Sequence, residues 1–137
     1  MASIRSGIGE NVEDRYLFKA KHFKEWHIGN IVKEPDGLYI RDIKENVMAY
    51  IDDESTICQC TGLKDKNGKL IWENDIMVAH LDEDYQEDET YIRILWYESG
   101  FCSKEKGSED ISPIDKFDQE HFEVCGNIFD NPEFIIK

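Results

Sequence analysis

The sequence predicts a mainly β fold, either a small SH3-like barrel or two packed antiparallel sheets with at most one or two short helices. Two observations lead to this prediction. Short runs of β-branched and aromatic residues recur along the chain, and clusters of turn-forming residues separate them. Hardly any segment has apolar residues at helical spacing. The alternative fold class is α+β.

The first third of the chain predicts a tail and then a hairpin. Residues 1–14 are polar, contain Gly7 and Gly9 and show no periodicity, so we expect a flexible tail. Along residues 15–21 the side chains of Tyr16, Phe18 and Ala20 alternate with Leu17 and Lys19, as in a strand. After a polar turn, residues 26–32 are again rich in β-forming residues, so the two segments are predicted to pair as a hairpin. Pro35-Asp36-Gly37 then predicts a turn that leads into a strand at 38–40.

The middle of the chain is less regular. Residues 42–51 fit helical spacing and a strand, and we favour the strand. Residues 52–55 predict a turn or one helical turn, with Ser55 as a cap. Asn67-Gly68 is the clearest hairpin signal, because this pair favours a type I′ turn.

The last part of the chain predicts further strands and one short helix. Strands are expected at residues 76–81, 91–97, 101–102 and 122–129. Ser112-Pro113 predicts a helix start, with Ile114 and Phe117 on the buried face. The 137 residues suit a single domain at 15–137, which can be divided into an N-terminal hairpin subdomain at 15–57 and a C-terminal small barrel at 58–137.

The chain is strongly acidic. Sixteen basic and 30 acidic residues give a net charge of −14, and six carboxylates gather in the short segment between two predicted strands. These six residues, which we call the acidic loop, are the predicted partner-binding residues: Asp82, Glu83, Asp84, Glu87, Asp88 and Glu89. A field of this sign repels nucleic acid and anionic membranes and favours a basic protein as the partner.

No motif predicts a catalytic, cofactor or metal site. Cys58, Cys60, Cys102 and Cys125 lack the two close ligand pairs of a structural zinc site, so we interpret them as free thiols. The sequence has neither a nucleophile elbow nor a glycine-rich phosphate loop. The lack of these motifs predicts a non-enzymatic protein. The lack of a long apolar segment and of a signal peptide predicts that it stays in the cytoplasm.

Two segments of the chain resemble the YopX family. The first is Thr61-Gly-Leu-Lys-Asp-Lys-Asn-Gly-Lys-Leu-Ile-Trp-Glu-Asn-Asp-Ile76, and the second is Glu123-Val-Cys-Gly-Asn-Ile-Phe-Asp-Asn-Pro-Glu-Phe134. Tyr16 to Ala20, followed by Glu25-Trp26 and Gly29, is similar to the opening hairpin of the family. Two departures are Asn74, where the family usually has Gly, and the acidic loop, which looks like an insertion. The resemblance implies a YopX-like fold and an origin in bacteriophages and prophages, but it transfers no site.

These observations predict a phage accessory protein that works by association. The expected partner is a second copy of the chain, through strand edges, or a basic host or phage protein, through the acidic loop. One alternative is a small nucleic-acid-binding β-barrel, in which aromatic residues stack bases and lysines contact phosphates. Another is a small metal-dependent enzyme that uses some of the 30 acidic residues.

Overall fold

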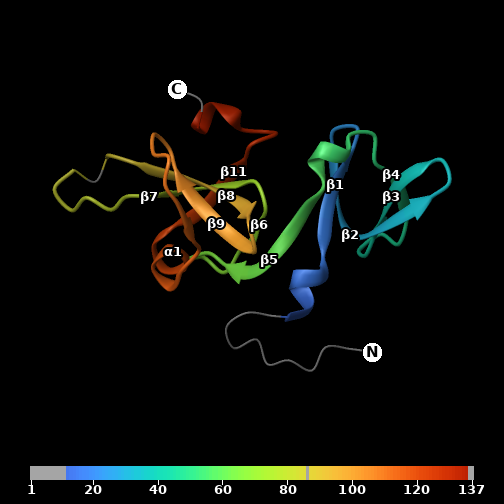
Figure 1. Ribbon diagram of the computed structural model, residues 1–137, viewed down its shortest axis with the longest axis horizontal. Helices are drawn as coiled ribbons and strands as arrows, with labels where there is room; N and C mark the ends of the chain where they lie inside the picture. The colour runs from blue at the N-terminus through green and yellow to red at the C-terminus, as the bar shows by residue number, and fades with distance from the viewer. Residues whose placement is uncertain (1–11, 86, 136–137) are drawn as a thin grey trace. The chain divides into compact units, whose positions relative to one another are not determined.

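The structure is a computed structural model that describes residues 12–85 and 87–135. Within these residues the chain forms eleven β-strands, one α-helix and three short 3-10 helices (Figure 1). Residues 1–11 of the predicted tail lie outside the described residues. The described part of that tail belongs to a 3-10 helix, Val12–Tyr16, so regular structure begins before the predicted start at Arg15.

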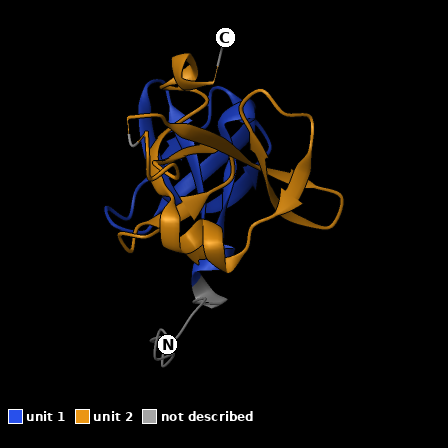
Figure 2. Cartoon of the chain, turned by 90° about the vertical axis from the view of Figure 1, so that its left-hand side faces the viewer, with its two compact units in different colours: residues 1–62 blue, residues 63–137 orange. Residues whose placement is uncertain are grey.

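The chain divides into two compact units, residues 1–62 and 63–137 (Figure 2). We call them unit 1 and unit 2. The boundary lies inside strand β5, Cys58–Lys64, and not at the predicted division between residues 57 and 58. Each unit has its own apolar core.

Unit 1 is built around a long antiparallel hairpin. Its strands are β1 (Phe18–His22), β2 (Glu25–Glu34), β3 (Gly37–Asp42), β4 (Met48–Tyr50) and the first part of β5. The predicted hairpin is confirmed, with Phe18 opposite Gly29 and His22 opposite Glu25. Alternate residues point inward, as a strand requires, and Ala20, Ile40, Ala49 and Ile51 form the buried core of this unit.

Unit 2 holds the remaining elements. After the end of β5 these are β6 (Leu70–Trp72), β7 (Asp75–Ala79), β8 (Thr90–Tyr97), β9 (Gly100–Glu105), β10 (Ile111–Pro113), α1 (Lys116–His121), β11 (Glu123–Asn127) and the 3-10 helix η3 (Pro132–Phe134). All five residues of β7 are buried, as expected for a central strand. Its core consists of Ile71, Met77, Ala79, Ile92, Ile94 and Phe122.

The strands form two antiparallel sheets, and the mainly β prediction is confirmed. The six-stranded sheet has the order β4-β3-β2-β1-β5-β6, and the five-stranded sheet has the order β10-β9-β8-β7-β11. Each order runs from one edge strand to another, so the described strands do not close into a barrel. The SH3-like barrel is therefore wrong, and the two-sheet form of the prediction is the observed one.

The hairpin at Asn67-Gly68 exists, but its turn type was predicted wrongly. A type I′ turn needs positive φ at both central residues, and only Gly68 has it, at 82°. The Gly68 N–H instead bonds to the Asp65 carbonyl at 2.9 Å, and the Asp65 Oδ1 accepts the Asn67 and Lys69 N–H groups at 2.9 Å each. The aspartate before the Asn-Gly pair thus determines this turn.

The helix prediction near Ser112 is also wrong. Ser112 and Pro113 lie in β10, where Pro113 sits opposite Cys102 in an edge strand that tolerates the missing N–H. The helix starts after Asp115, which forms a capping box with Asp118, and Phe117 is 49% exposed instead of buried.

Two smaller predictions need correction. The cap of the 3-10 helix Glu54–Thr56 is Asp53, not Ser55, because the Asp53 carboxylate accepts the Ser55 N–H. Of the predicted strand at 42–51, Asp42 is the last residue of β3, residues 48–50 form β4, and the rest are not in a strand. The residues between β3 and β4 form a turn in which Asn46 has a φ of 58°.

Candidate acidic binding surface

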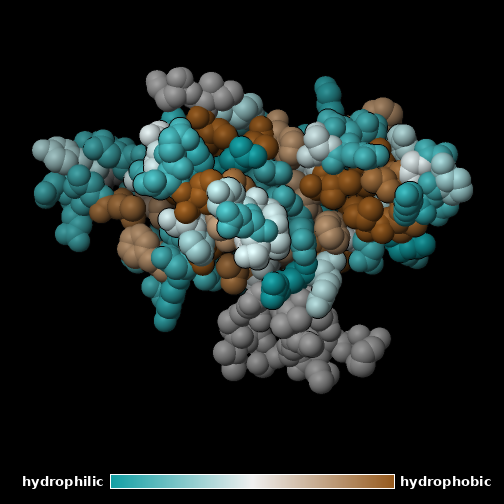
Figure 3. Space-filling view, in the orientation of Figure 1, coloured by the Kyte–Doolittle hydropathy of each residue, from teal (hydrophilic) through white to brown (hydrophobic). Residues whose placement is uncertain are grey.

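The acidic loop connects β7 to β8 in unit 2 (Figure 1). All six of its carboxylate residues are exposed, and the loop is coloured hydrophilic in Figure 3. Asp82 orders the start of the loop, because its Oδ1 accepts the N–H groups of Asp84 and Tyr85 at 2.8 and 3.2 Å. The loop therefore presents its charge to solvent from a defined turn.

The charge of the acidic loop is almost unneutralised. Among the described residues, Glu89 is the one loop carboxylate with a basic side chain within 4 Å, because its Oε2 lies 3.8 Å from the Nε2 of His80, which is charged only when protonated. Glu89 Oε1 also accepts the Tyr91 hydroxyl at 2.6 Å, and this bond, together with burial, raises the pKa of Tyr91 to about 12. The other five carboxylates form no ion pair within the described chain.

The acidic charge is concentrated in unit 2. Unit 1 has 8 basic and 11 acidic residues, so its net charge is 8 − 11 = −3. Unit 2 has 8 basic and 19 acidic residues, so its net charge is 8 − 19 = −11. A partner attracted by charge is therefore drawn mainly to unit 2.

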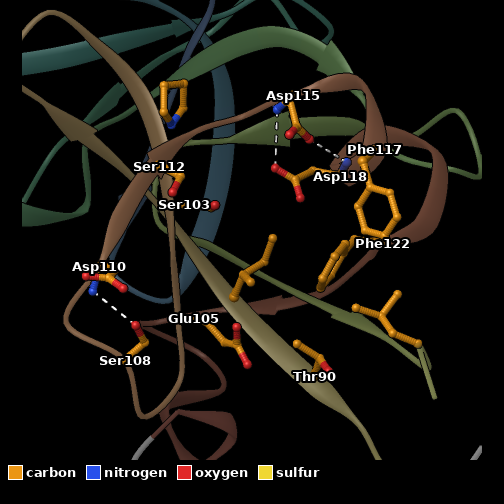
Figure 4. Close-up of a pocket in the computed structure, with 13 residues that line it drawn as sticks. Thr90, Ser103, Glu105, Ser108, Asp110, Ser112, Asp115, Phe117, Asp118 and Phe122 are labelled. Atoms are coloured by element: carbon orange, nitrogen blue, oxygen red, sulfur yellow. Dashed lines mark hydrogen bonds between the residues drawn. The ribbon is translucent and has the colours of Figure 1, made fainter.

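A cavity of about 390 Å³ lies in unit 2 next to the acidic loop (Figure 4). Leu81 and Thr90, which flank the loop, line one part of it. Four carboxylate residues and three serines provide its polar lining: Glu105, Asp110, Asp115, Asp118, Ser103, Ser108 and Ser112. None of the residues that line it is Lys, Arg or His. The cavity thus has the same charge sign as the loop.

A second hollow joins the cavity to the loop. Its volume is about 520 Å³, and the carboxylates of Glu87, Asp88 and Glu89 outnumber the one cationic residue that lines it, Lys106. Thr90 and Glu105 line both hollows, so they share a wall. The loop and the cavity therefore form one continuous acidic surface, which we call the acidic surface of unit 2.

Asp115 and Asp118 lie at one end of the cavity, at the start of α1 (Figure 4). The Asp118 N–H donates to Asp115 Oδ1 at 2.9 Å, and the Asp115 N–H donates to Asp118 Oδ2 at 3.2 Å. Partial burial raises the pKa of Asp118, and the neighbouring charge of Asp115 raises it further. A cation placed between the two carboxylates would relieve this repulsion.

The sequence predicted the acidic loop but missed the cavity. Asp110, Asp115 and Asp118 are separated by Ile-Ser-Pro-Ile and Lys-Phe, which match no known binding motif. Ser103 and Phe122 come from β9 and from the end of α1, and only the fold brings them to the same cavity. The spacing of Asp115 and Asp118 was the one available signal, since it is typical of a helix cap.

Unit 1 holds a histidine–carboxylate group that the sequence analysis also missed. His27 Nδ1 lies 2.8 Å from Asp42 Oδ2, and Glu45 places a carboxylate within 4.8 Å of both. Asp42 Oδ1 accepts the N–H groups of Lys44 and Glu45 at 2.8 and 2.9 Å. These bonds close the turn between β3 and β4, so the pair has a clear structural role.

The four cysteines are free thiols. Cys58, Cys60 and Cys102 are buried, and Cys125 is partly buried. Burial raises the pKa of the Cys125 thiol to about 11, which leaves it protonated and weakly nucleophilic at neutral pH. The described residues contain no helix that is both long and apolar enough to cross a membrane.

Comparison with known proteins identifies the family. No curated protein matches the sequence. The family model described as YopX protein matches residues 13–135, which is nearly the whole chain. The match includes both units and both of the segments that carry the resemblance. The chain therefore belongs to the YopX family.

Proposed function

We propose that this protein is a non-enzymatic accessory protein of phage or prophage origin that binds a basic protein through the acidic surface of unit 2. The observation that carries this proposal is the exposed acidic loop, five of whose six carboxylates have no cationic partner within the described chain. The adjoining cavity, whose lining has no cationic residue, extends the same charge.

The physical basis is electrostatic complementarity. Carboxylates that form no ion pair within their own chain lose none when a lysine or arginine of another protein approaches them. A surface of one sign also steers an oppositely charged partner during diffusion and rejects partners of its own sign. Nucleic acid and anionic lipid are rejected for this reason, so a cytoplasmic protein with a basic surface is the proposed partner.

Binding of basic peptides to a loop variant tests the proposal. The variant E83Q/D84N/E87Q/D88N removes four loop charges and changes the net charge from −14 to −10. Its matched control, E25Q/E54Q/E98Q/E109Q, removes four exposed charges elsewhere and has the same net charge. Fluorescein-labelled octalysine is the probe, measured by fluorescence anisotropy at low and physiological salt, with labelled oligo-dT as the anionic comparison.

We expect the wild-type protein and the control variant to bind octalysine with affinities within about threefold of each other, and the loop variant to bind about tenfold more weakly. Affinity should fall as salt rises, because screening shortens the range of the interaction to about 8 Å at physiological ionic strength. Equal weakening of the two variants would show that only net charge matters. Tighter binding of oligo-dT than of octalysine would contradict a basic protein partner and indicate nucleic acid instead.

Self-association is the second candidate, and the edge strand β4 favours it. β4 is an edge of the six-stranded sheet, and Val47, Met48 and Tyr50 are 45%, 38% and 42% exposed. Unpaired edges with apolar side chains can pair with a second copy. Light scattering after size exclusion would show a dimer that the variant M48K/Y50K converts to a monomer. A wild-type protein that stays monomeric at every concentration would exclude this candidate.

A further inference from the structure

The cavity beside the acidic loop has features that general attraction of cations does not require. Its floor is apolar, with Ile92 and Phe122 both buried in the core of unit 2. Phe117, which also lines it, is half exposed; one face of its ring stacks on the His121 ring, with the centroids 4.1 Å apart, and the proposed contact uses the other face. Acceptor groups thus lie beside an apolar floor, which suits a side chain with an apolar stem and a cationic end.

The carboxylates of Asp115 and Asp118 each keep one oxygen available. The capping box uses Asp115 Oδ1 and Asp118 Oδ2. Asp115 Oδ2 and Asp118 Oδ1 accept no hydrogen bond from any described residue. Two acceptor oxygens from neighbouring residues are therefore free to receive donors from a ligand.

Ser103 is a second and independent observation. It is only 9% exposed, it lies in β9 and it lines the cavity (Figure 4). Within the described chain its hydroxyl has no hydrogen-bond partner. Among the described residues the fully buried polar atoms without a partner are His27 Nε2 and Arg93 Nε, so the Ser103 oxygen is not sealed in the core but open to the cavity. A ligand donor in the cavity would satisfy it.

We propose that the cavity is an arginine-selective subsite that accepts one arginine side chain of the basic partner. This inference rests on the proposed function and specifies which residue of the partner is anchored. The guanidinium would donate to the free oxygens of Asp115 and Asp118 and to the Ser103 hydroxyl. The methylene stem would cover Phe122, and the guanidinium plane would lie against the exposed ring of Phe117.

Arginine suits this lining better than lysine for two reasons. A guanidinium has five donors in a planar fork and can serve several separate acceptors at once, whereas an ammonium is a compact charge with three donors. The guanidinium plane also stacks on aromatic rings and loses hydration more readily than an ammonium. The acidic loop contains Tyr85 and lies beside Tyr91, but its carboxylates are exposed and it lacks the buried apolar floor of the cavity, so we expect it to distinguish the two cations less.

The experiment compares labelled octa-arginine with octalysine on four proteins. These are the wild-type protein, the cavity variant D115N/D118N, its matched control E109Q/E120Q and the acidic-loop variant E83Q/D84N/E87Q/D88N. Asparagine is a good N-cap at position 115, and at position 118 its side-chain oxygen can still accept the N–H of residue 115. Ser103→Ala is a further variant that changes no charge, and far-ultraviolet circular dichroism checks the fold of each protein.

The wild-type protein and the E109Q/E120Q control should bind octa-arginine about tenfold more tightly than octalysine. In D115N/D118N this ratio should fall to about twofold, and in Ser103→Ala it should fall by about threefold. The loop variant should lose affinity for both peptides and keep the ratio. That pattern would establish two separable parts of the acidic surface of unit 2.

Other outcomes separate the two proposals. A wild-type ratio near one, or a ratio that neither D115N/D118N nor Ser103→Ala changes, would overturn the arginine subsite. If the loop variant still weakens octalysine binding in that case, the proposed function stands without the subsite. If neither peptide binds the wild-type protein, both proposals fail.

Discussion

Asp42 is the residue on which the turn between β3 and β4 depends. Hydrogen bonds from the Glu45 N–H and the His27 ring, with a further one from Lys44, hold the pKa of Asp42 below its usual value. A carboxyl group with a lowered pKa stabilises the fold above its unfolded pKa, near 4, and loses this contribution as pH falls through the folded value. Asp42→Asn should therefore lower the free energy of unfolding by about 1–3 kcal/mol at pH 7.

Urea unfolding of the wild-type protein and of Asp42→Asn between about pH 3 and pH 7 measures this contribution. The difference between them should be constant above about pH 5 and should shrink below pH 4, where the wild-type carboxyl becomes protonated. Asp36→Asn, at an exposed position, is the control and should change stability little. A difference that does not depend on pH would show that the Asp42 charge is not the cause.

Gly29 is required for the close approach of β2 to the end of β3. A Cβ atom at this position would lie 1.7 Å from the Arg41 carbonyl oxygen, a contact with backbone that no side-chain rotation can relieve. Gly29→Ala should therefore lower the free energy of unfolding by about 3 kcal/mol or more. Gly100→Ala is the matched control, because nothing lies within 4 Å of its Cβ position. Equal denaturation midpoints for the two variants would contradict this account.

The sequence identified some residues of the two candidate sites and missed others. The acidic loop was visible because its six carboxylates are close together in the chain and fall between two β-rich runs. Ser103 gave no signal, because a lone serine in a strand has the same appearance whether its hydroxyl faces solvent or a cavity. His27 and Asp42 are 15 positions apart, and only the register of β2 and β3 places them together.

At the element scale, Asp65 joins the β5–β6 turn to β11. Its Oδ1 accepts two N–H groups inside the turn, and its Oδ2 accepts the Val124 N–H at 2.8 Å. Asp65 is only 6% exposed, so its removal leaves buried donors without a partner. Asp65→Ala should lower the free energy of unfolding by about 2–4 kcal/mol, measured by chemical denaturation.

The neighbouring residue Asn67 provides the control for Asp65. Asn67→Ala removes one exposed hydrogen bond to Glu123, at 2.9 Å, and should cost less than about 1 kcal/mol. Equal effects of the two substitutions would show that the Asn-Gly pair, and not the aspartate before it, determines the turn.

The elements of the fold were predictable to the extent that their signals are local. The first hairpin and the β7 and β8 strands were predicted because alternation and β-branched residues act along the strand itself. The predicted helix start at Ser112 was wrong because the segment contains two possible N-cap residues, Ser112 and Asp115. Asp115 has a partner three residues later in Asp118, whereas Ser112 precedes a proline that pairs with β9. The closed barrel was wrong because strand order depends on contacts between distant residues.

At the scale of the whole molecule, the two units differ in charge. Unit 2 has a net charge of −11 and unit 1 of −3, although the units have similar numbers of residues. The proposed partner should therefore be recognised by unit 2. This asymmetry does not follow from the total of −14, and it became visible only when the boundary at residue 62 was known.

The most direct test of this account is an NMR titration of the isotope-labelled protein with octa-arginine at physiological salt. The account predicts that amide shifts change in the acidic loop, around Ser103 in β9 and from Asp115 to the end of α1, and that the strands of unit 1 stay unchanged. Shift changes spread evenly over the exposed carboxylates of both units would show non-specific attraction and contradict a defined acidic surface on unit 2.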